Sequence, residues 1–175
     1  GDVLLIQGEN GCGKTTLLKL LSGLMKPATG HIYTVDKDIT EQGAVARSRF
    51  IGLVLQNPNH QLFAESVIAE IQQTGVTKAQ AQTWLERLNL MHCAQQHPQA
   101  LSQGQKRRLA LGAVLARQPD VCLLDEIMVG QDPQSLEVML NALQVFTQWG
   151  GTLIFTSHDP DVAKMLQPRS ITLGG

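Results

Sequence analysis

Aromatic residues and cysteines are scarce in this 175-residue sequence. Aromatic side chains make up 4% of it, with one tyrosine, Tyr33. The three cysteines, Cys12, Cys93 and Cys122, are far apart and lack metal-ligand spacing, which excludes a disulfide scaffold and fits a reducing cytosol. No apolar run approaches the roughly 20 residues that cross a bilayer, and nothing resembles a signal peptide. We therefore expect any membrane role to come through a partner chain.

The sequence also lacks an excess of charge of either sign. The 14 basic and 15 acidic residues give a net charge of −1, whereas a protein whose main ligand is a nucleic-acid backbone carries a basic excess. We predict no nucleic-acid partner. The length and the hydrophobic fraction of 43% suit one domain with a sizeable core and room for a small subdomain.

A glycine-rich stretch from Gly8 to Thr16 is the strongest motif. It fits the pattern G-x-x-x-x-G-K-[ST], follows the apolar run 3–6 and precedes an amphipathic pattern. Successive backbone N–H groups of such a loop point inward and bind phosphate oxygens, helped by the following helix N-terminus. The sequence therefore predicts a nucleotide site. Its expected binding residues are Gly8, Asn10, Gly11, Cys12, Gly13, Lys14, Thr15 and Thr16.

Individual residues of this loop have separate expected roles. Lys14 is predicted to reach the β- and γ-phosphates, and the Thr15 hydroxyl to be one Mg²⁺ ligand. Thr16 fits the first turn of the helix. Cys12 has two interpretations, a small residue that fits the loop or a thiol whose pKa the loop amides lower; we favour the first.

Strand and helix patterns alternate along the chain. Apolar runs predict strands at 3–6, 31–35, 50–55, 121–124, 152–156 and 170–173, and residues 36–43 read as a polar excursion with turns. Helical periodicity predicts helices at 14–23, 67–75, from 77, from 102 to 117, from 133, and from 160. Alternation of this kind indicates an α/β fold with a parallel sheet, whose ligands lie beyond the carboxyl ends of the strands.

Two acidic residues, Asp125 and Glu126, follow the apolar strand 121–124. Asp125 is placed to reach the magnesium shell as a Walker B aspartate, and Glu126 to direct a carboxylate at an attacking water. A positioned general base contributes about 10²–10⁴ in rate. Glu126→Gln is thus predicted to preserve binding and to remove most turnover.

Five further motifs follow the phosphate loop in a fixed order: Gln56, residues 101–105, Asp125-Glu126, Asp132 and His158. With these motifs in this order, the chain resembles an ATP-binding cassette (ABC) ATPase domain over nearly its whole length. The most diagnostic motif is Leu-Ser-x-Gly-Gln at 101–105, followed by Lys-Arg-Arg. The resemblance implies a P-loop NTPase fold, a mostly parallel sheet flanked by helices with a small inserted α-helical subdomain. It places a RecA-like ATP-binding core at 1–57 and 119–175, and the helical subdomain with the signature motif at 58–118.

The resemblance also implies roles for residues outside the phosphate loop. Gln56 matches the Q-loop glutamine that senses Mg²⁺ and water, so the implied metal set is Thr15, Gln56 and Asp125. His158 matches the switch histidine at the γ-phosphate, which makes Glu126, His158 and Gln56 the implied catalytic residues. The resemblance further implies a dimer interface, at which residues of this chain close on ATP held by a second subunit. These residues are Ser102, Gln103, Gly104 and Gln105 of the signature motif and Asp132 of the D-loop.

Residues 56–63, Gln-Asn-Pro-Asn-His-Gln-Leu-Phe, resemble more narrowly the Q-loop of ATPases from energy-coupling-factor importers and their cobalt and nickel relatives. In such importers the ATPase couples to integral membrane transporter subunits through this region. The resemblance implies a homodimer or heterodimer of ABC ATPases at the cytoplasmic face of the cell membrane. It also implies uptake of a vitamin or transition-metal ion.

The sequence departs from the family pattern at several places. Gln103 replaces the first signature glycine, and Ile127-Met128 replace the usual Pro-Thr after Glu126, which bears on the aim of that carboxylate. The upstream strands and the aromatic residue that stacks on adenine are not in this sequence, and no motif places Tyr33 there. We expect either a fragment or a naturally reduced domain.

Two other functions remain as alternatives. A non-hydrolytic or truncated nucleotide-binding module would bind ATP weakly and be insensitive to Glu126→Gln. A soluble ABC protein of DNA repair or translation would carry coiled-coil insertions or tandem cassettes, which this sequence does not show.

Overall fold

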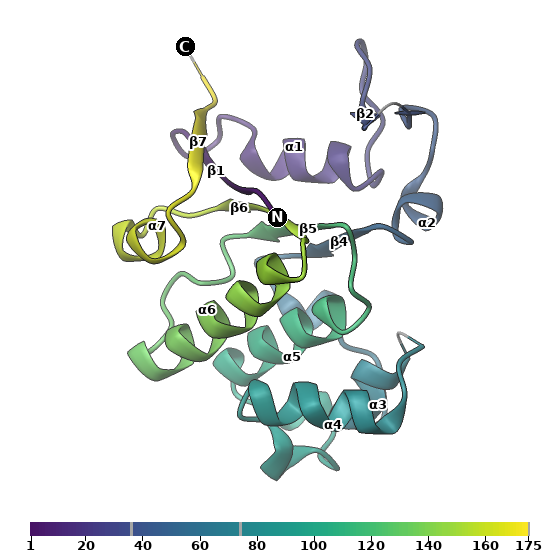
Figure 1. Ribbon diagram of the computed structural model, residues 1–175, viewed down its shortest axis with the longest axis vertical. Helices are drawn as coiled ribbons and strands as arrows, with labels where there is room; N and C mark the ends of the chain where they lie inside the picture. The colour runs from purple at the N-terminus through teal and green to yellow at the C-terminus, as the bar shows by residue number, and fades with distance from the viewer. Residues whose placement is uncertain (36, 74, 175) are drawn as a thin grey trace.

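A five-stranded parallel sheet lies at the centre of the computed structural model, which describes residues 1–35, 37–73 and 75–174 (Figure 1). The strand order is β4-β5-β6-β1-β7, and every neighbouring pair is parallel. The strands are β1 (Val3–Gln7), β4 (Ile51–Val54), β5 (Val121–Asp125), β6 (Thr152–Thr156) and β7 (Arg169–Thr172). These match five of the six predicted strands to within one residue at each end, which confirms the predicted α/β fold.

Helices cover both faces of the sheet (Figure 1). One face packs against α1 (Lys14–Leu21), and the other against α5 (Gln103–Leu115) and α6 (Pro133–Gln148), with α7 (Pro160–Leu166) beside α6. Successive residues of a strand point to opposite faces. In β1, accordingly, Leu5 belongs to the larger core cluster and Ile6 to the smaller one under α1.

A short antiparallel hairpin follows α1. It pairs β2 (Tyr33–Thr34) with β3 (Lys37–Asp38) and leads into α2 (Ala44–Arg47). The strand predicted at 31–35 is therefore shorter than expected. The prediction of turns alone for 36–43 was wrong at residues 37–38, which form β3. These residues are a strand because they pair with β2 across the hairpin, and not because of their local propensity. Residue 36, part of that predicted segment, lies outside the described residues.

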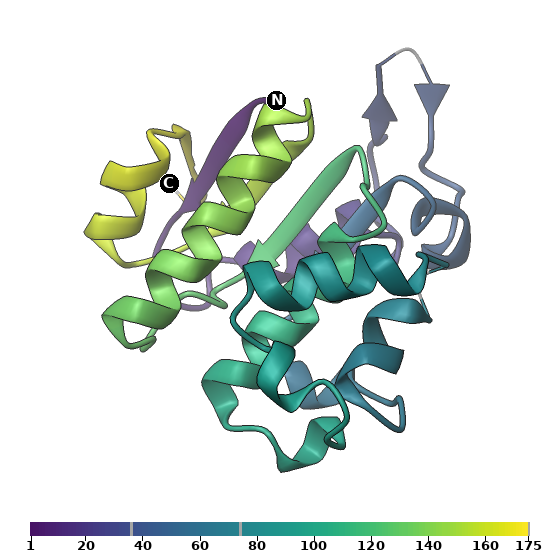
Figure 2. The same ribbon diagram turned by 60° about the horizontal axis from the view of Figure 1, so that its bottom comes forward.

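The middle of the chain is helical. Its elements are η1 (Pro58–His60), α3 (Val67–Gln72), α4 (Lys78–Arg87), η2 (Met91–Cys93), η3 (Pro98–Ala100) and α5. They gather on one side of the molecule (Figure 2), and no strand occurs among the described residues of 58–118. Thr77 and Ser102 both form capping boxes at the helix starts that the sequence predicted.

The parallel sheet brings the predicted polar clusters to one edge. Because β1, β4, β5 and β6 run in the same direction, the residues that follow their carboxyl ends emerge side by side. β1 leads into the phosphate loop, β4 into Gln56, β5 into Glu126, and β6 into His158. Among the described residues, no helix is long and apolar enough to cross a membrane.

Candidate nucleotide site

Three glycines shape the loop between β1 and α1. Gly8, Gly11 and Gly13 have φ of 149°, 86° and 102°, in the region that favours glycine. A Cβ at Gly8 would also lie 2.5 Å from Sγ of Cys12 and 2.6 Å from the Leu173 carbonyl oxygen. At Gly11 and Gly13 a Cβ would meet nothing within 4 Å, so backbone conformation and open space are what these two positions supply.

The loop and the start of α1 line a hollow of about 280 Å³. Its lining residues are Asn10, Gly11, Gly13, Lys14, Thr15, Thr16, Gln56 and Glu126. Most of the predicted nucleotide-binding residues therefore meet in one place, together with two of the predicted catalytic residues. Gly8 lines a neighbouring hollow with His158, and Cys12 is a free, half-buried thiol outside both linings.

Lys14 is held against the loop that it follows. Its side chain is buried, and Nζ donates to the carbonyl oxygens of Gly8 at 2.8 Å and Glu9 at 3.0 Å. An ammonium has three N–H donors, so two bonds fix it beside the hollow and one donor remains. This geometry suits a cation that meets phosphate oxygens.

Oxygen atoms from three elements meet beneath the loop. The Thr15 hydroxyl donates to Asp125 Oδ2 at 2.9 Å, and the Thr156 hydroxyl lies 3.2 Å from Asp125 Oδ1. Asp125 is 5% exposed. Thr15 and Asp125 offer oxygen ligands of the kind that Mg²⁺ takes while keeping waters and phosphate oxygens. No cluster of three or more His, Cys, Asp or Glu side chains suited to a metal occurs in the described parts of the chain.

Glu126 lies between the two other predicted catalytic residues. Gln56 Nε2 donates to Glu126 Oε2 at 3.3 Å, and His158 Nε2 lies 3.3 Å from Glu126 Oε1. The carboxylate is half-buried, with 21% of the side chain exposed against 49% for His158. Residues after β4, β5 and β6 thus meet at one carboxylate, which the sequence pattern alone does not specify.

The backbone at Glu126 explains how the carboxylate is aimed. Glu126 has φ of 51°, an uncommon left-handed conformation for a residue other than glycine. Its N–H donates to the Thr156 hydroxyl at 3.0 Å, while Ile127 and Met128 are almost fully buried. Ile127 and Met128, which replace the usual Pro-Thr, therefore anchor the turn after β5 in the core. Thr156 was not predicted as a site residue, although a hydroxyl at the end of a buried strand is a signal that could have identified it.

The signature and D-loop residues lie at helix starts away from the hollow. Ser102 caps α5, where its Oγ accepts from the N–H of Gln105 at 3.2 Å. Asp132 caps α6 by accepting from the N–H of Ser135 at 2.9 Å, and hydrogen bonds from Ser135 lower the pKa of Asp132. Among these residues none lines the hollow formed by the loop.

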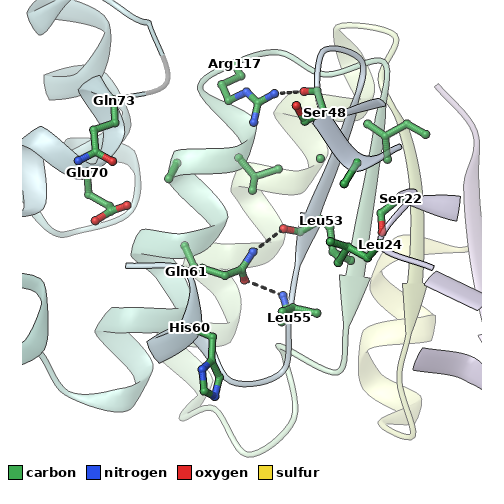
Figure 3. Close-up of a pocket in the computed structure, with 16 residues that line it drawn as sticks. Ser22, Leu24, Ser48, Leu53, Leu55, His60, Gln61, Glu70, Gln73 and Arg117 are labelled. Carbon is green, nitrogen blue, oxygen red and sulfur yellow. Dashed lines mark hydrogen bonds between the residues drawn. The ribbon is translucent and has the colours of Figure 1, made fainter. Parts of the chain in front are cut away.

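A groove runs between β4 and α5, beside the segment 56–63 that follows β4, here called the Gln56 segment (Figure 3). Its volume is about 690 Å³, and its lining includes Leu24, Leu53, His60, Glu70 and Arg117. β4 is an edge strand. The side chain of Gln61 accepts from the Leu55 N–H and donates to the Leu53 carbonyl, each at 2.8 Å, which ties the segment after Gln56 to that edge.

A family model described as ABC transporter matches residues 1–129 of the chain. The chain belongs to the ABC transporter family. It is an ABC ATPase nucleotide-binding domain with the P-loop NTPase fold. The expected family is thereby confirmed.

Relatives of this ABC domain support the same assignment. A Methanosarcina acetivorans protein named as an ABC transporter ATP-binding protein is 35% identical over 99% of this chain. YkoD of Bacillus subtilis, named as an HMP/thiamine import ATP-binding protein, is 35% identical over 93% of it. In both cases the chain spans 30% of the relative's length.

A solved structure is also close to this ABC domain. The cbiO1 protein from Clostridium perfringens, described as part of the ABC transporter complex cbiONQ, superposes with a TM-score of 0.81. The two are 30% identical, and the match covers 98% of this chain and 73% of that one.

Proposed function

We propose that this ABC domain binds and hydrolyses ATP with Mg²⁺ and powers the uptake of a small solute through a membrane partner. The observation that carries the proposal is the position of the Glu126 carboxylate between Gln56 and His158, beside the phosphate loop. Phosphoryl transfer to water needs a phosphate cradle, a metal site and a group that orients water. This edge of the sheet has a candidate for each.

The proposed roles follow from the contacts. The loop amides and Lys14 bind the phosphates. Thr15, Asp125 and Gln56 would hold Mg²⁺, which would neutralise phosphate charge. Glu126 accepts the proton of the attacking water. Gln56 and His158 orient this carboxylate, and His158 is exposed enough to reach the γ-phosphate.

A second ABC subunit, identical or related, is part of the proposal. Ser102, Gln103, Gly104 and Gln105 of the signature and Asp132 lie outside the hollow, which supports their use on ATP held by the other subunit. Each monomer then contributes half of two sites. Turnover is expected to rise more steeply than linearly with protein concentration, because dimerisation is linked to concentration.

The proposed membrane partner binds at the groove between β4 and α5. Phe63, at the end of the Gln56 segment, is 76% exposed, while Glu70 fixes the neighbouring backbone by accepting from the N–H groups of Phe63 and Ala64 at 2.8 and 2.7 Å. An exposed aromatic on a fixed backbone suits an interface. The name of YkoD, an HMP/thiamine import protein, supports a vitamin as solute, and the description of cbiO1 as part of an ABC transporter complex supports a membrane partner. A transition-metal ion as the other candidate solute, and a location at the cytoplasmic face of the membrane, rest on the resemblance of residues 56–63.

The test is Mg²⁺-dependent ATP hydrolysis over a range of protein concentration, comparing this chain with its Glu126→Gln variant. We expect turnover to fall by about 10²–10⁴, as for loss of a positioned base, while ATP binding is retained. Turnover equal in the two proteins would overturn the role of Glu126. ATP binding without turnover in the unmodified chain would instead favour a non-hydrolytic module.

A separate test addresses the membrane partner. Phe63→Asp is expected to keep ATP hydrolysis and to abolish co-purification with the membrane subunits of the transporter. Loss of hydrolysis together with co-purification would mean that Phe63 is structural, and retained co-purification would contradict the proposed interface.

A further inference from the structure

Lys106 is a buried lysine without an acidic partner. It follows the signature motif in the first turns of α5 and is 7% exposed. Ion pairs among the described residues join other groups, and Lys106 takes part in none of them. Burying an ammonium costs free energy, and a cation near a helix N-terminus opposes the helix dipole. Stability therefore does not explain a charge at this position.

Two neutral amide oxygens receive the ammonium. Lys106 Nζ donates to Asn59 Oδ1 at 3.0 Å and to Gln99 Oε1 at 3.1 Å. Asn59 belongs to η1, three residues after Gln56, and Gln99 belongs to η3, just before the signature motif. One side chain thus joins the segment after β4 to both flanks of the signature motif.

Hydrogen bonds lead along the segment that Lys106 holds, residues 56–59, to the proposed catalytic carboxylate. Asn57 accepts from the Asn59 N–H at 3.1 Å and caps η1, and Gln56 next to it donates to Glu126 at 3.3 Å. A shift of η1 relative to α5 would therefore be passed on to Gln56. The signature motif and the Glu126 carboxylate are linked through few bonds, with Lys106 in the middle.

The two arginines that follow Lys106 support this interpretation of α5. Arg107 Nη1 donates to the carbonyl oxygen of Val129, in the loop after Glu126, at 2.5 Å. Arg108 Nη1 donates to the hydroxyl of Ser135, also at 2.5 Å. The N–H of the same serine donates to the capping residue Asp132. Consecutive basic residues of one helix thus contact η1 and η3, the loop after Glu126, and the first turn of α6. Lys106 is the one directed at the Gln56 segment.

We propose that Lys106 is a positioning residue for ATP hydrolysis, which fixes the Gln56 segment to the signature helix so that Gln56 stays aligned on Glu126. The inference rests on the proposed function and deepens it. It predicts that loss of the ammonium slows turnover in the dimer and leaves nucleotide binding at the phosphate loop unchanged.

Lys106→Met tests this, because methionine keeps most of the apolar stem and removes the three donors. We expect kcat to fall about tenfold or more, since a misplacement of ~1 Å can cost up to about 10²-fold in rate. The KM for ATP and the Kd for MgATP are expected to stay within about twofold. The melting temperature is expected to change little, because Gln99 is exposed and Asn59 half-buried, so that their side-chain oxygens can accept from water once the ammonium is gone.

A double-mutant cycle separates positioning from local packing. Asn59→Ala removes the acceptor on the Gln56 segment and is expected to lower kcat by a similar factor. If the two residues act through one bond, the double variant is no slower than the slower single variant. Lys78→Met, which removes an exposed lysine from the first turn of α4, is the matched control and is expected to change neither kcat nor melting temperature.

The outcomes are distinct. An unchanged kcat in Lys106→Met, fully additive effects in the cycle, or a kcat loss matched by a fall in melting temperature would each overturn the inference while leaving the proposed function intact. An unmodified chain that binds MgATP and does not hydrolyse it would overturn the proposed function, and this inference with it.

Discussion

The hydroxyl of Thr15, at the start of α1, donates to both carboxylate oxygens of Asp125, 110 positions along the chain, at 2.9 and 3.1 Å. The bond joins the phosphate loop to the end of β5, the strand that precedes Glu126. A hydroxyl and a carboxylate already in contact need little movement to share one Mg²⁺ between them. The contact thus brings together the two residues proposed as metal ligands.

We predict that Thr15→Val lowers ATP turnover by about 10–10³-fold and raises the Mg²⁺ concentration needed for half-maximal rate, because valine keeps the shape of threonine without its oxygen. Thr15→Ser is the control and is expected to retain most of the activity. The measurement is hydrolysis titrated with Mg²⁺. If valine and serine behave alike, the hydroxyl is not a metal ligand.

Local patterns predicted the strands and the phosphate loop well. The run 121–124 is apolar throughout and ends in Asp125, as expected of a strand buried on both faces, and the structure places β5 at Val121–Asp125, between β4 and β6 in the sheet. The caps at Thr77, Ser102 and Asp132 were likewise predictable, because a cap depends on three or four adjacent residues.

Contacts between distant segments could not be predicted in the same way. The meeting of Gln56, Glu126 and His158 depends on the order β4-β5-β6 in the sheet. Side-chain periodicity carries no information about that order. The left-handed backbone at Glu126 and the bond from its N–H to Thr156 are likewise set by the packing of Ile127 and by the neighbouring strand.

Asp132 gives a prediction about pH. Hydrogen bonds from the hydroxyl and then the N–H of Ser135 lower the pKa of Asp132 below its ordinary value of 3.8. A carboxyl with a lower pKa in the folded chain stabilises the fold above that ordinary value, and loses this contribution as the pH falls through the folded-state pKa. Asn at the same position still caps a helix but does not titrate.

The unmodified chain is therefore predicted to be more stable than Asp132→Asn at pH 7, with the difference shrinking as the pH falls below about 4. The measurement is urea unfolding of both proteins at pH 7, 5 and 3. Other acidic groups titrate in both proteins and cancel in the comparison. A difference that stays constant down to pH 3 would contradict the cap as its source.

Arg47 is buried, at 1% exposed, and is predicted to be essential for stability. Its guanidinium donates to the carbonyl oxygens of Leu20 and Leu21, at the end of α1, at 2.7 and 2.8 Å, and to those of Ile39 and Thr40 at 2.7 and 3.1 Å. Methionine there leaves four carbonyls without this donor. We expect Arg47→Met to cost about 3–5 kcal/mol in the free energy of unfolding.

Arg49→Met is the matched control for that measurement, because Arg49 is exposed. It is expected to change the free energy of unfolding by no more than about 0.5 kcal/mol. Both values come from urea unfolding followed by circular dichroism. Equal effects of the two substitutions would mean that the carbonyls at the end of α1 find other donors.

The two tryptophans of the chain give the last prediction. Trp84 of α4 and Trp149 at the end of α6 meet edge to face, with ring centroids 6.0 Å apart, and the Arg87 guanidinium lies 5.0 and 5.6 Å from the two ring centroids. Edge-to-face pairs contribute about 0.5–1.5 kcal/mol and exposed cation–π contacts about 0.5–1 kcal/mol. The cluster joins α4 to α6, which are far apart in the sequence.

Trp149→Ala is therefore predicted to lower the free energy of unfolding by about 1–2.5 kcal/mol, although Trp149 is 52% exposed. A cycle with Arg87→Ala is expected to show a coupling of about 0.5–1 kcal/mol, because both substitutions remove the same cation–π contact. Urea unfolding followed by circular dichroism measures both quantities and avoids the change in fluorescence that the substitution causes. Strictly additive effects would mean that the guanidinium and the Trp149 ring do not stabilise each other, and that the stability lost in Trp149→Ala comes from its packing on Trp84 alone.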